Sequence, residues 1–250
     1  MAAYLTLTRR ELSAFFLALR GYTVIAMAAF LMGLSFVSLV SKLQGEPTPM
    51  PITEIFYNTN YFWFIILFSA PVITMRLFAL EKYSGTFETL MTTPISDAQV
   101  VLAKFTAALF FYSVLWLPLL ACVLILRYVS QDPTLIDPGT LGSTFLGIFL
   151  LGALYMSMGC FASALTSSQI VAAMVSFSLG IGLFILGFIV DQFPMRKTWS
   201  SDTLSYMSMH VHMSDFARGV IDTRYIVFYL SLTVFFLFLT YRVVESRRWK

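Results

Sequence analysis

Long apolar runs without charge alternate with short polar segments along this chain. Residues 21–40 and 105–126 contain no charged side chain, and residues 142–190 run for 49 residues without Lys, Arg, Asp, Glu or His. A helix needs roughly 20 apolar residues to cross the hydrocarbon core of a bilayer, so the longest run holds two crossings and a short turn. The pattern predicts an all-α integral membrane protein with six transmembrane helices, at about 21–40, 60–79, 105–127, 142–164, 169–190 and 224–243.

Composition agrees with this pattern and limits where chemistry can take place. Of the 250 residues, 58% are hydrophobic and 12% are charged, whereas a soluble domain carries about a quarter charged residues. The segments between the predicted spans are too short for a separate water-soluble domain, so residues 1–250 are expected to form a single transmembrane domain. Cys122 and Cys160 both fall in apolar runs, which indicates packing rather than a disulfide framework or a metal site.

Residues 8–20 predict an amphipathic helix on the membrane surface. Thr8 and Glu11 fit a capping box, in which a hydroxyl and a carboxylate satisfy the first free amides of a helix. Apolar residues recur on one face at helical spacing, namely Leu12, Phe15, Phe16 and Leu19. The alternative is a simple extension of the first span. That span is too long for the apolar region of a signal peptide, so we expect it to be retained.

Basic residues predict how the chain is oriented, because Lys and Arg gather on the cytoplasmic side of membrane proteins. An even number of spans with both termini in the cytoplasm of an inner-membrane protein fits best. The inner segments then hold ten basic residues, which are Arg9, Arg10, Arg20, Arg76, Lys82, Lys104, Arg242, Arg247, Arg248 and Lys250. The outer segments hold six, which are Lys42, Arg127, Arg196, Lys197, Arg218 and Arg224.

The inner segment over residues 76–104 predicts a short helix between two spans. Gly85 can end one helix and Thr86 can cap the next. Ser96 and Asp97 can start the helix that enters the third span. An apolar strip lies beside Glu88 and ends at a proline, and its members are Phe87, Leu90, Met91 and then Pro94. By spacing alone, this segment fits a helix presented to the cytoplasm and an ordinary interfacial connector equally well.

Three pieces of sequence, in this order, resemble the ABC-2 type transporter permeases. The first resembles the cytoplasmic loop of that family and consists of Glu81–Lys82–Tyr83–Ser84–Gly85–Thr86–Phe87–Glu88–Thr89–Leu90, followed by Thr93–Pro94–Ile95–Ser96 and Lys104. The second, Gly159–Cys160–Phe161–Ala162–Ser163–Ala164–Leu165, resembles its small-residue fourth span. The third, Phe216–Ala217–Arg218–Gly219–Val220–Ile221–Asp222, resembles a motif before its last span. Length and motifs are most similar to the gliding-motility-associated permease group.

The resemblance implies an exporter subunit that works with other chains. Two permease subunits, identical or different, would form the membrane core, and a separate ABC ATPase would dock on the loop 80–104. The implied coupling residues are Glu81, Gly85, Thr86, Phe87, Glu88, Leu90 and Pro94. Residues 8–20 would be the connecting helix, and residues 191–223 would hold two short re-entrant helices with the motif Arg218, Gly219 and Asp222. Arg218 and Asp222 are one helical turn apart and are expected to pair.

Other functions fit the sequence less well or remain open. A phosphate loop needs a glycine followed by lysine, and this chain has no such pair, so ATP and Mg²⁺ are expected on the partner, with no cofactor, metal or catalytic residue here. An intramembrane enzyme would need a base, but His210 and His212 both lie in an outer segment. The net charge of +3 gives no indication of nucleic-acid binding, and membrane lipids are the expected surroundings. A non-transporting anchor of a larger envelope machine remains an alternative.

Overall fold

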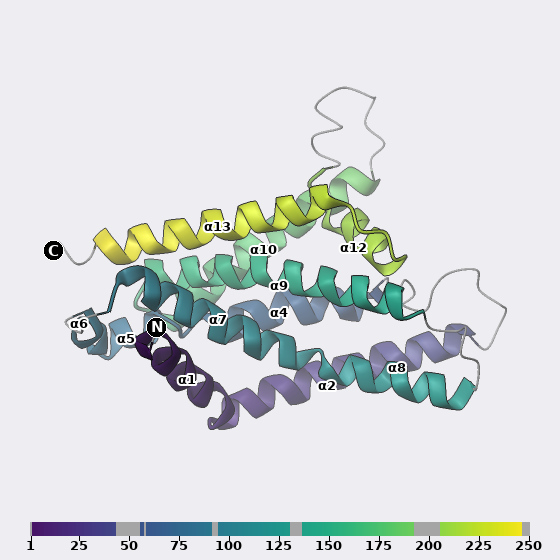
Figure 1. Ribbon diagram of the computed structural model, residues 1–250, viewed down its shortest axis with the longest axis horizontal. Helices are drawn as coiled ribbons and strands as arrows, with labels where there is room; N and C mark the ends of the chain where they lie inside the picture. Colours follow the sequence, from purple (N-terminus) through teal and green to yellow (C-terminus); the bar gives the residue numbers. More distant parts are fainter. Residues whose placement is uncertain are drawn as a thin grey trace.

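The structure is a computed structural model, and it describes residues 2–43, 56–57, 59–91, 95–130, 137–192 and 206–246. Apolar runs and capping residues give long helices joined by short turns within these ranges (Figure 1). The helices are α1 (Ala2–Phe16), α2 (Leu19–Leu43), α4 (Asn60–Thr74), α5 (Ala79–Tyr83), α6 (Thr86–Met91), α7 (Asp97–Leu115), α8 (Leu117–Ser130), α9 (Pro138–Leu165), α10 (Gln169–Gln192), α12 (Met209–Ala217) and α13 (Thr223–Ser246).

The prediction of six apolar spans is confirmed. They cover Leu19–Ser41, Asn60–Tyr83, Asp97–Val129, Pro138–Leu165, Gln169–Gly187 and Thr223–Ser246. The third span is 33 residues long because α7 and α8 follow one another with a break at Trp116. Pro118 lies just inside α8 and cannot donate a backbone hydrogen bond, which explains the break. The helix predicted to begin at Ser96 and Asp97 is also confirmed, since Ser96 caps α7 in a capping box with Gln99.

Helix α9 lies at the centre of the bundle and is buried along most of its length. It packs against α4, α7, α10, α12 and α13. Its glycines allow this close packing: a Cβ on Gly152 would lie 2.0 Å from the Tyr112 ring, and one on Gly159 would lie 2.1 Å from Thr74 Oγ1. These small residues therefore pack within the subunit.

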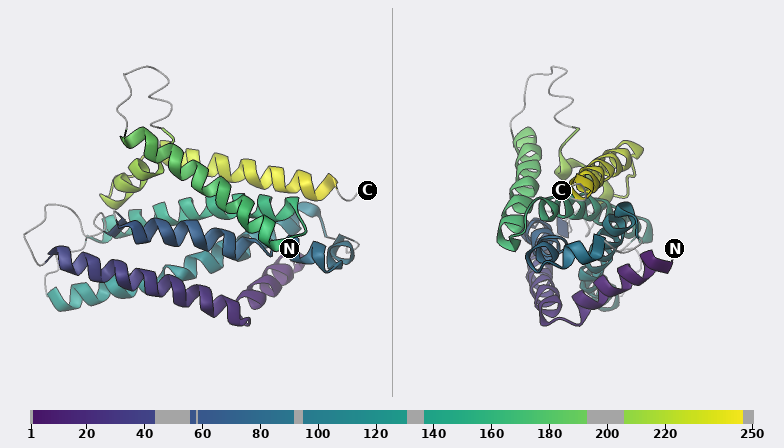
Figure 2. Two further views of the ribbon diagram at one scale, coloured as in Figure 1. Left: turned by 180° about the vertical axis from the view of Figure 1, so that it is seen from behind. Right: turned by 90° about the vertical axis from the view of Figure 1, so that its left-hand side faces the viewer.

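The two ends of the bundle carry different elements. Both chain termini lie at the end that also holds α5 and α6, and α12 lies toward the opposite end (Figures 1 and 2). We call these the α5–α6 end and the α12 end. An even number of spans requires both termini to share one side of the membrane, and the arrangement agrees with this.

Helix α1 is separate from the first span rather than an extension of it. It ends at Phe16, the chain bends at Leu17 and Ala18, and α2 starts at Leu19 in a different direction (Figure 2). The predicted capping box at Thr8 and Glu11 is wrong, because α1 already begins at Ala2 and both residues lie inside it. The Thr8 hydroxyl donates to the carbonyl of Tyr4 at 2.9 Å.

Helix α1 is held against α7 by aromatic and polar contacts. The Phe15 ring stacks on Phe111 with centroids 4.9 Å apart, and Phe16 meets the same ring edge-on. The Tyr4 hydroxyl donates to Thr106 Oγ1 at 3.0 Å. These contacts fix the N-terminal helix to the start of the third span.

Candidate coupling site

Gly85 lies in the turn between the short helices α5 and α6. Gly85 has a φ of +72°, a left-handed conformation that glycine adopts without strain. No heavy atom would lie within 4 Å of a Cβ on Gly85, so the backbone angle alone selects glycine there. Thr86 begins α6, and its hydroxyl lies 2.9 Å from Ser84 Oγ. Gly85, Thr86 and Glu88 are exposed at this end of the molecule.

Ser163, near the end of α9, holds the start of α5 in place. The first amides of a helix have no partner within the helix. The Ser163 hydroxyl accepts from the amides of Phe78 and Ala79 at 3.0 and 3.1 Å and lies 3.3 Å from the carbonyl of Met75. The ammonium group of Lys82 donates to the carbonyl of Ala164 in the same place. The connection between the second span and α5 is therefore fixed to the end of the central helix.

A group of four charged side chains fixes α5 to α1 and α7 as well. Lys104 Nζ lies 3.0 Å from Glu11 Oε1 and 2.9 Å from Glu81 Oε1. Arg10 Nη2 lies 2.8 and 2.9 Å from the same two oxygens. We call Arg10, Glu11, Glu81 and Lys104 the charge cluster. Its two acids and two bases sum to zero, which makes burial of Lys104 tolerable.

Burial and charge act in opposite directions on Glu11, which lies in α1 outside the spans. Burial alone would raise the pKa of its carboxyl, because a charged group loses hydration. Lys104 and Arg10 outweigh this and hold the pKa of Glu11 below its usual value. The carboxylate is therefore ionised at neutral pH and can hold Lys104.

The first two motif pieces meet in space, and the third lies elsewhere. Residues 75–84 pack on residues 159–164, at the α5–α6 end. Residues 216–222 pack on the first half of α9 instead: Ser143 Oγ donates to the carbonyl of Phe216 at 2.6 Å, and a Cβ on Gly219 would lie 3.0 Å from Thr140. Helix α9 thus contacts a different motif near each of its two ends.

Arg218 and Asp222 do not lie on one continuous helix, so they are not one helical turn apart. Helix α12 ends at Ala217, and Gly219 has a φ of +88°. Asp222 directly precedes the next helix: its Oδ1 accepts from the amide of Arg224 at 2.8 Å, at the start of α13. Glycine in a left-handed conformation is a common helix stop, and this one separates the two residues into different elements.

The remaining predicted site residues lie in different surroundings, and some lie outside the described part of the chain. Glu81 belongs to the charge cluster rather than to the surface of α6. The side chain of Phe87, one of the implied coupling residues, is 7% exposed, and Lys82 Nζ lies 5.3 Å from its ring centroid. Pro94 and the side chain of Leu90 lie outside the described part of the chain, as do residues 193–205 of the predicted re-entrant segment.

Sequence reasoning missed the side chains that hold this site together. From the sequence, Lys104 is interpreted as a marker of orientation and part of a motif, Glu11 as part of a capping box, and Ser163 as part of the small-residue fourth span. Both histidines lie on α12 among aromatic rings: His210 stacks on Trp63 and His212 on Tyr225. A lysine near the start of an apolar run, with two acids in neighbouring polar segments, is the signal that could have found the charge cluster.

These features define a polytopic membrane protein with six apolar helices, of which the glycine-bearing α9 is the central one. Comparison with protein families identifies which one: residues 50–244 match the family described as ABC-2 family transporter protein, and the chain belongs to it. A comparison with curated proteins found no match. The protein is thus a transmembrane permease of the ABC transporter class.

Proposed function

We propose that this permease is the membrane subunit of an ABC exporter, and that a separate ATPase docks on α5 and α6. The observation that supports this most is the double attachment of α5. Ser163 and Lys82 tie it to the end of α9, and the charge cluster ties it to α1 and α7. An ordinary connector would not need to be fixed to three elements of the bundle.

Such an attachment suits a segment that transmits movement. A displacement of α6 by a nucleotide-driven partner would pass through α5 to the end of α9, because hydrogen bonds and ion pairs join them directly. Helix α1 would follow, since Glu11 shares the Glu81–Lys104 contact. ATP and Mg²⁺ would be held by the ATPase, and this chain would supply the coupling surface and the pathway.

The orientation follows from the same proposal. The α5–α6 end and both termini would face the cytoplasm, and α1 would lie at the inner-membrane surface. The α12 end would face outward, where α12 would enter the membrane as one of the two proposed re-entrant helices. A second permease subunit, identical or different, would complete the transport pathway.

The docking surface can be tested by reversing charge on α6. Glu88 is exposed, and Glu88→Lys places a cation where we propose the ATPase contacts the permease. Leu90→Asp tests the apolar position two residues further on, since an interface anchor often contributes about 2 kcal/mol, or roughly 30-fold in affinity. Glu245→Lys is the matched control, because it makes the same change at the same end of the bundle but on α13. ATPase bound to the purified permease is the quantity to measure.

We expect both α6 variants to insert normally and to retain much less ATPase than the Glu245→Lys control. ATPase recovery at the wild-type level with Leu90→Asp would show that the segment is only a connector. ATP hydrolysis by the reconstituted complex then distinguishes a transporting permease from a non-transporting anchor. A permease should raise ATP hydrolysis when its substrate is present, whereas an anchor should leave the rate unchanged across all candidate substrates.

A further inference from the structure

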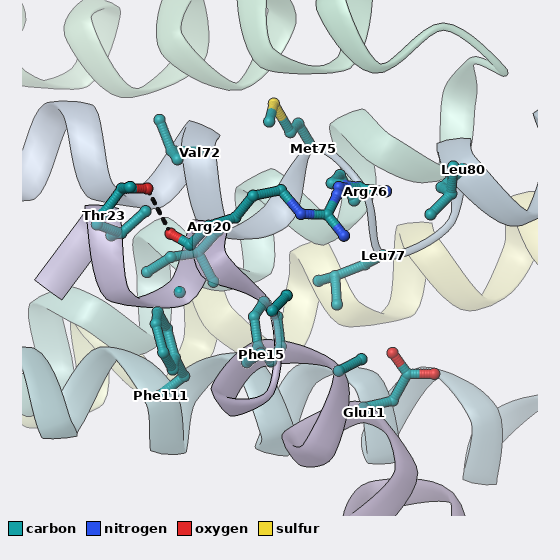
Figure 3. A pocket seen from close by; sticks show the side chains of 15 residues that line it. Glu11, Phe15, Arg20, Thr23, Val72, Met75, Arg76, Leu77, Leu80 and Phe111 are labelled. Carbon is teal, nitrogen blue, oxygen red and sulfur yellow. Dashed lines mark hydrogen bonds between the residues drawn. The ribbon is translucent and has the colours of Figure 1, made fainter.

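Two adjoining cavities lie between α2 and α4. The first, of about 240 Å³, lies at the α5–α6 end between the α1–α2 corner, the end of α4 and α7 (Figure 3). The second, of about 720 Å³, extends along α2 and α4 within the spans. Thr23, Val24 and Val72 line both. The two cavities therefore form one groove that runs from the end of the bundle along the side of two spans.

The end cavity is positively charged. Arg20 and Arg76 both line it, and Figure 3 shows the Arg20 side chain extending across it toward the connection that carries Arg76. Glu11 lies in the same wall, but its carboxylate is bound by Lys104 and Arg10. Among the residues that the structure describes, no ion pair engages Arg20 or Arg76. The guanidinium groups of Arg20 and Arg76 thus share a cavity, and no carboxylate of the described residues forms an ion pair with either.

The longer cavity is apolar and opens to the side of the bundle. Its walls include Met27 and Phe68, which are 63% and 54% exposed. The corner beside the charged cavity is also apolar, since Leu17 and Leu19 are 84% and 80% exposed. Side chains of this kind on a membrane protein face acyl chains. The groove therefore has a charged end near the membrane surface and an apolar length inside the hydrocarbon.

We propose that this groove holds a phospholipid with an anionic headgroup. The headgroup phosphate accepts hydrogen bonds from Arg20 and Arg76, and one acyl chain lies between α2 and α4. Guanidinium groups bind phosphate oxygens with charge-assisted, often paired hydrogen bonds. A soluble anion would use only the charged cavity, and an apolar helix of a second protein chain would fill only the longer one. The lipid matches both parts, and this site is independent of ATPase docking.

Such a lipid would add a connection between two parts of the chain at the α5–α6 end. Arg20 belongs to the start of α2, directly after the α1–α2 corner, and Arg76 lies between α4 and α5. A phosphate between them would connect the N-terminal corner to the segment that leads into α5. Lipid composition would then influence how firmly the α5–α6 end is held.

Native mass spectrometry of the detergent-solubilised permease, titrated with phosphatidylglycerol or phosphatidylcholine, tests the proposal. We expect tighter binding of phosphatidylglycerol. Each arginine near a lipid surface contributes about fivefold in affinity, so Arg20→Gln and Arg76→Gln together should weaken it about 25-fold. Arg9→Gln is the control, because Arg9 is exposed on α1 and does not line the groove. Val72→Trp should block binding by filling the groove where the cavities adjoin.

Three results would overturn the proposal. Equal affinity for the two lipids, or equal loss in the Arg9→Gln control, would show that Arg20 and Arg76 form no headgroup site. Displacement of bound phosphatidylglycerol by millimolar glycerol 3-phosphate would show that the charged cavity alone binds soluble anions. If Val72→Trp dissociates a permease dimer and leaves lipid binding unchanged, the groove is an interface between two copies of this chain.

Discussion

Lys104 is the residue whose environment most constrains this end of the molecule. Its side chain is 1% exposed, and its ammonium group lies between Glu11 and Glu81 with the Phe78 ring 5.4 Å away. A buried cation is stable only while its counter-charges remain close and hydrogen-bonded. The three helices that supply these groups must therefore stay together for the permease to remain folded.

Removing that cation should destabilise the protein strongly. Lys104→Met leaves Glu11 and Glu81 partly buried with only Arg10 to balance them, and we expect a loss of about 3 kcal/mol in the free energy of unfolding. Arg10→Gln is the control, because its side chain is 55% exposed and surface pairs contribute about 1 kcal/mol or less. A denaturant titration measures the free energy of unfolding of both variants. Adding Glu81→Gln to Lys104→Met should restore part of the stability; a Lys104→Met variant as stable as Arg10→Gln would contradict the role assigned to the cluster.

His212 should make stability depend on pH at the α12 end. Burial lowers the pKa of its ring to about 4, although Asp215 and Asp222 act in the opposite direction. An unfolded histidine has a pKa of about 6.5, so between these values the unfolded chain binds more protons than the folded one. Stability should therefore be constant above about pH 6.5 and should fall as the pH drops toward 4.

Thermal unfolding at pH 7.5 and pH 5 measures this effect. The wild type should lose more stability than His212→Gln over that interval, because the variant has no ring to protonate. His210→Gln is the matched control, since His210 stacks on Trp63 and Tyr57 and is less buried than His212. The idea fails if His212→Gln and the wild type show the same change between the two pH values.

At the scale of elements, α9 positions both ends of the permease. Near its first end it contacts α12 through Ser143 and Gly147, and near its last end it holds α5 through Ser163. Gly152 faces α7 and Gly159 faces α4, and at both positions a side chain would collide with the neighbouring helix. A change in the packing of this helix is therefore expected to affect both ends together.

Adding a methyl group to the packed face of α9 tests how closely this helix packs against its neighbours. In Gly159→Ala the new Cβ would lie 2.1 Å from Thr74 Oγ1 and 2.6 Å from its Cβ, so the helices must separate, and overpacking of this kind costs about 1–3 kcal/mol. Gly142→Ala is the control on the same helix, because nothing lies within 4 Å of its Cβ. It should be neutral or slightly stabilising, since alanine favours a helix by up to about 1 kcal/mol. Equal melting temperatures for the two variants would show that α4 and α9 do not approach this closely.

The spans could be predicted from the sequence because each is a local property. A charge-free run of about 20 residues has few alternatives to a membrane helix, and Gly85 and Ser96 marked helix ends through their own chemistry. Contacts between distant residues leave a weaker trace, because the sequence shows the charged residues but not which of them pair. The residues near Glu11 do not indicate that its partner is Lys104, and helical spacing alone does not show that Lys82 covers the Phe87 ring.

At the scale of the whole molecule, the positions of the termini allow a direct test of topology. Both termini, α5 and α6 lie at one end, while residues 218–221 lie toward the other (Figure 1). The basic residues of the chain favour a cytoplasmic position for the first end. Ser84 is exposed at the α5–α6 end, and Val220 is 53% exposed at the α12 end. These two positions therefore sample the two sides of the membrane.

Cysteine labelling should show that these two positions lie on opposite sides of the membrane. In a background with Cys122→Ala and Cys160→Ala, Val220→Cys should react with a membrane-impermeant maleimide added to intact cells. Ser84→Cys should react only after the membrane is opened, because six spans place it on the opposite side from Val220. Labelling of unfolded protein controls for intrinsic reactivity. If Ser84→Cys is labelled in intact cells and Val220→Cys is protected, the α5–α6 end faces outward, where no ATP is available, and docking of a cytoplasmic ATPase on that end is ruled out.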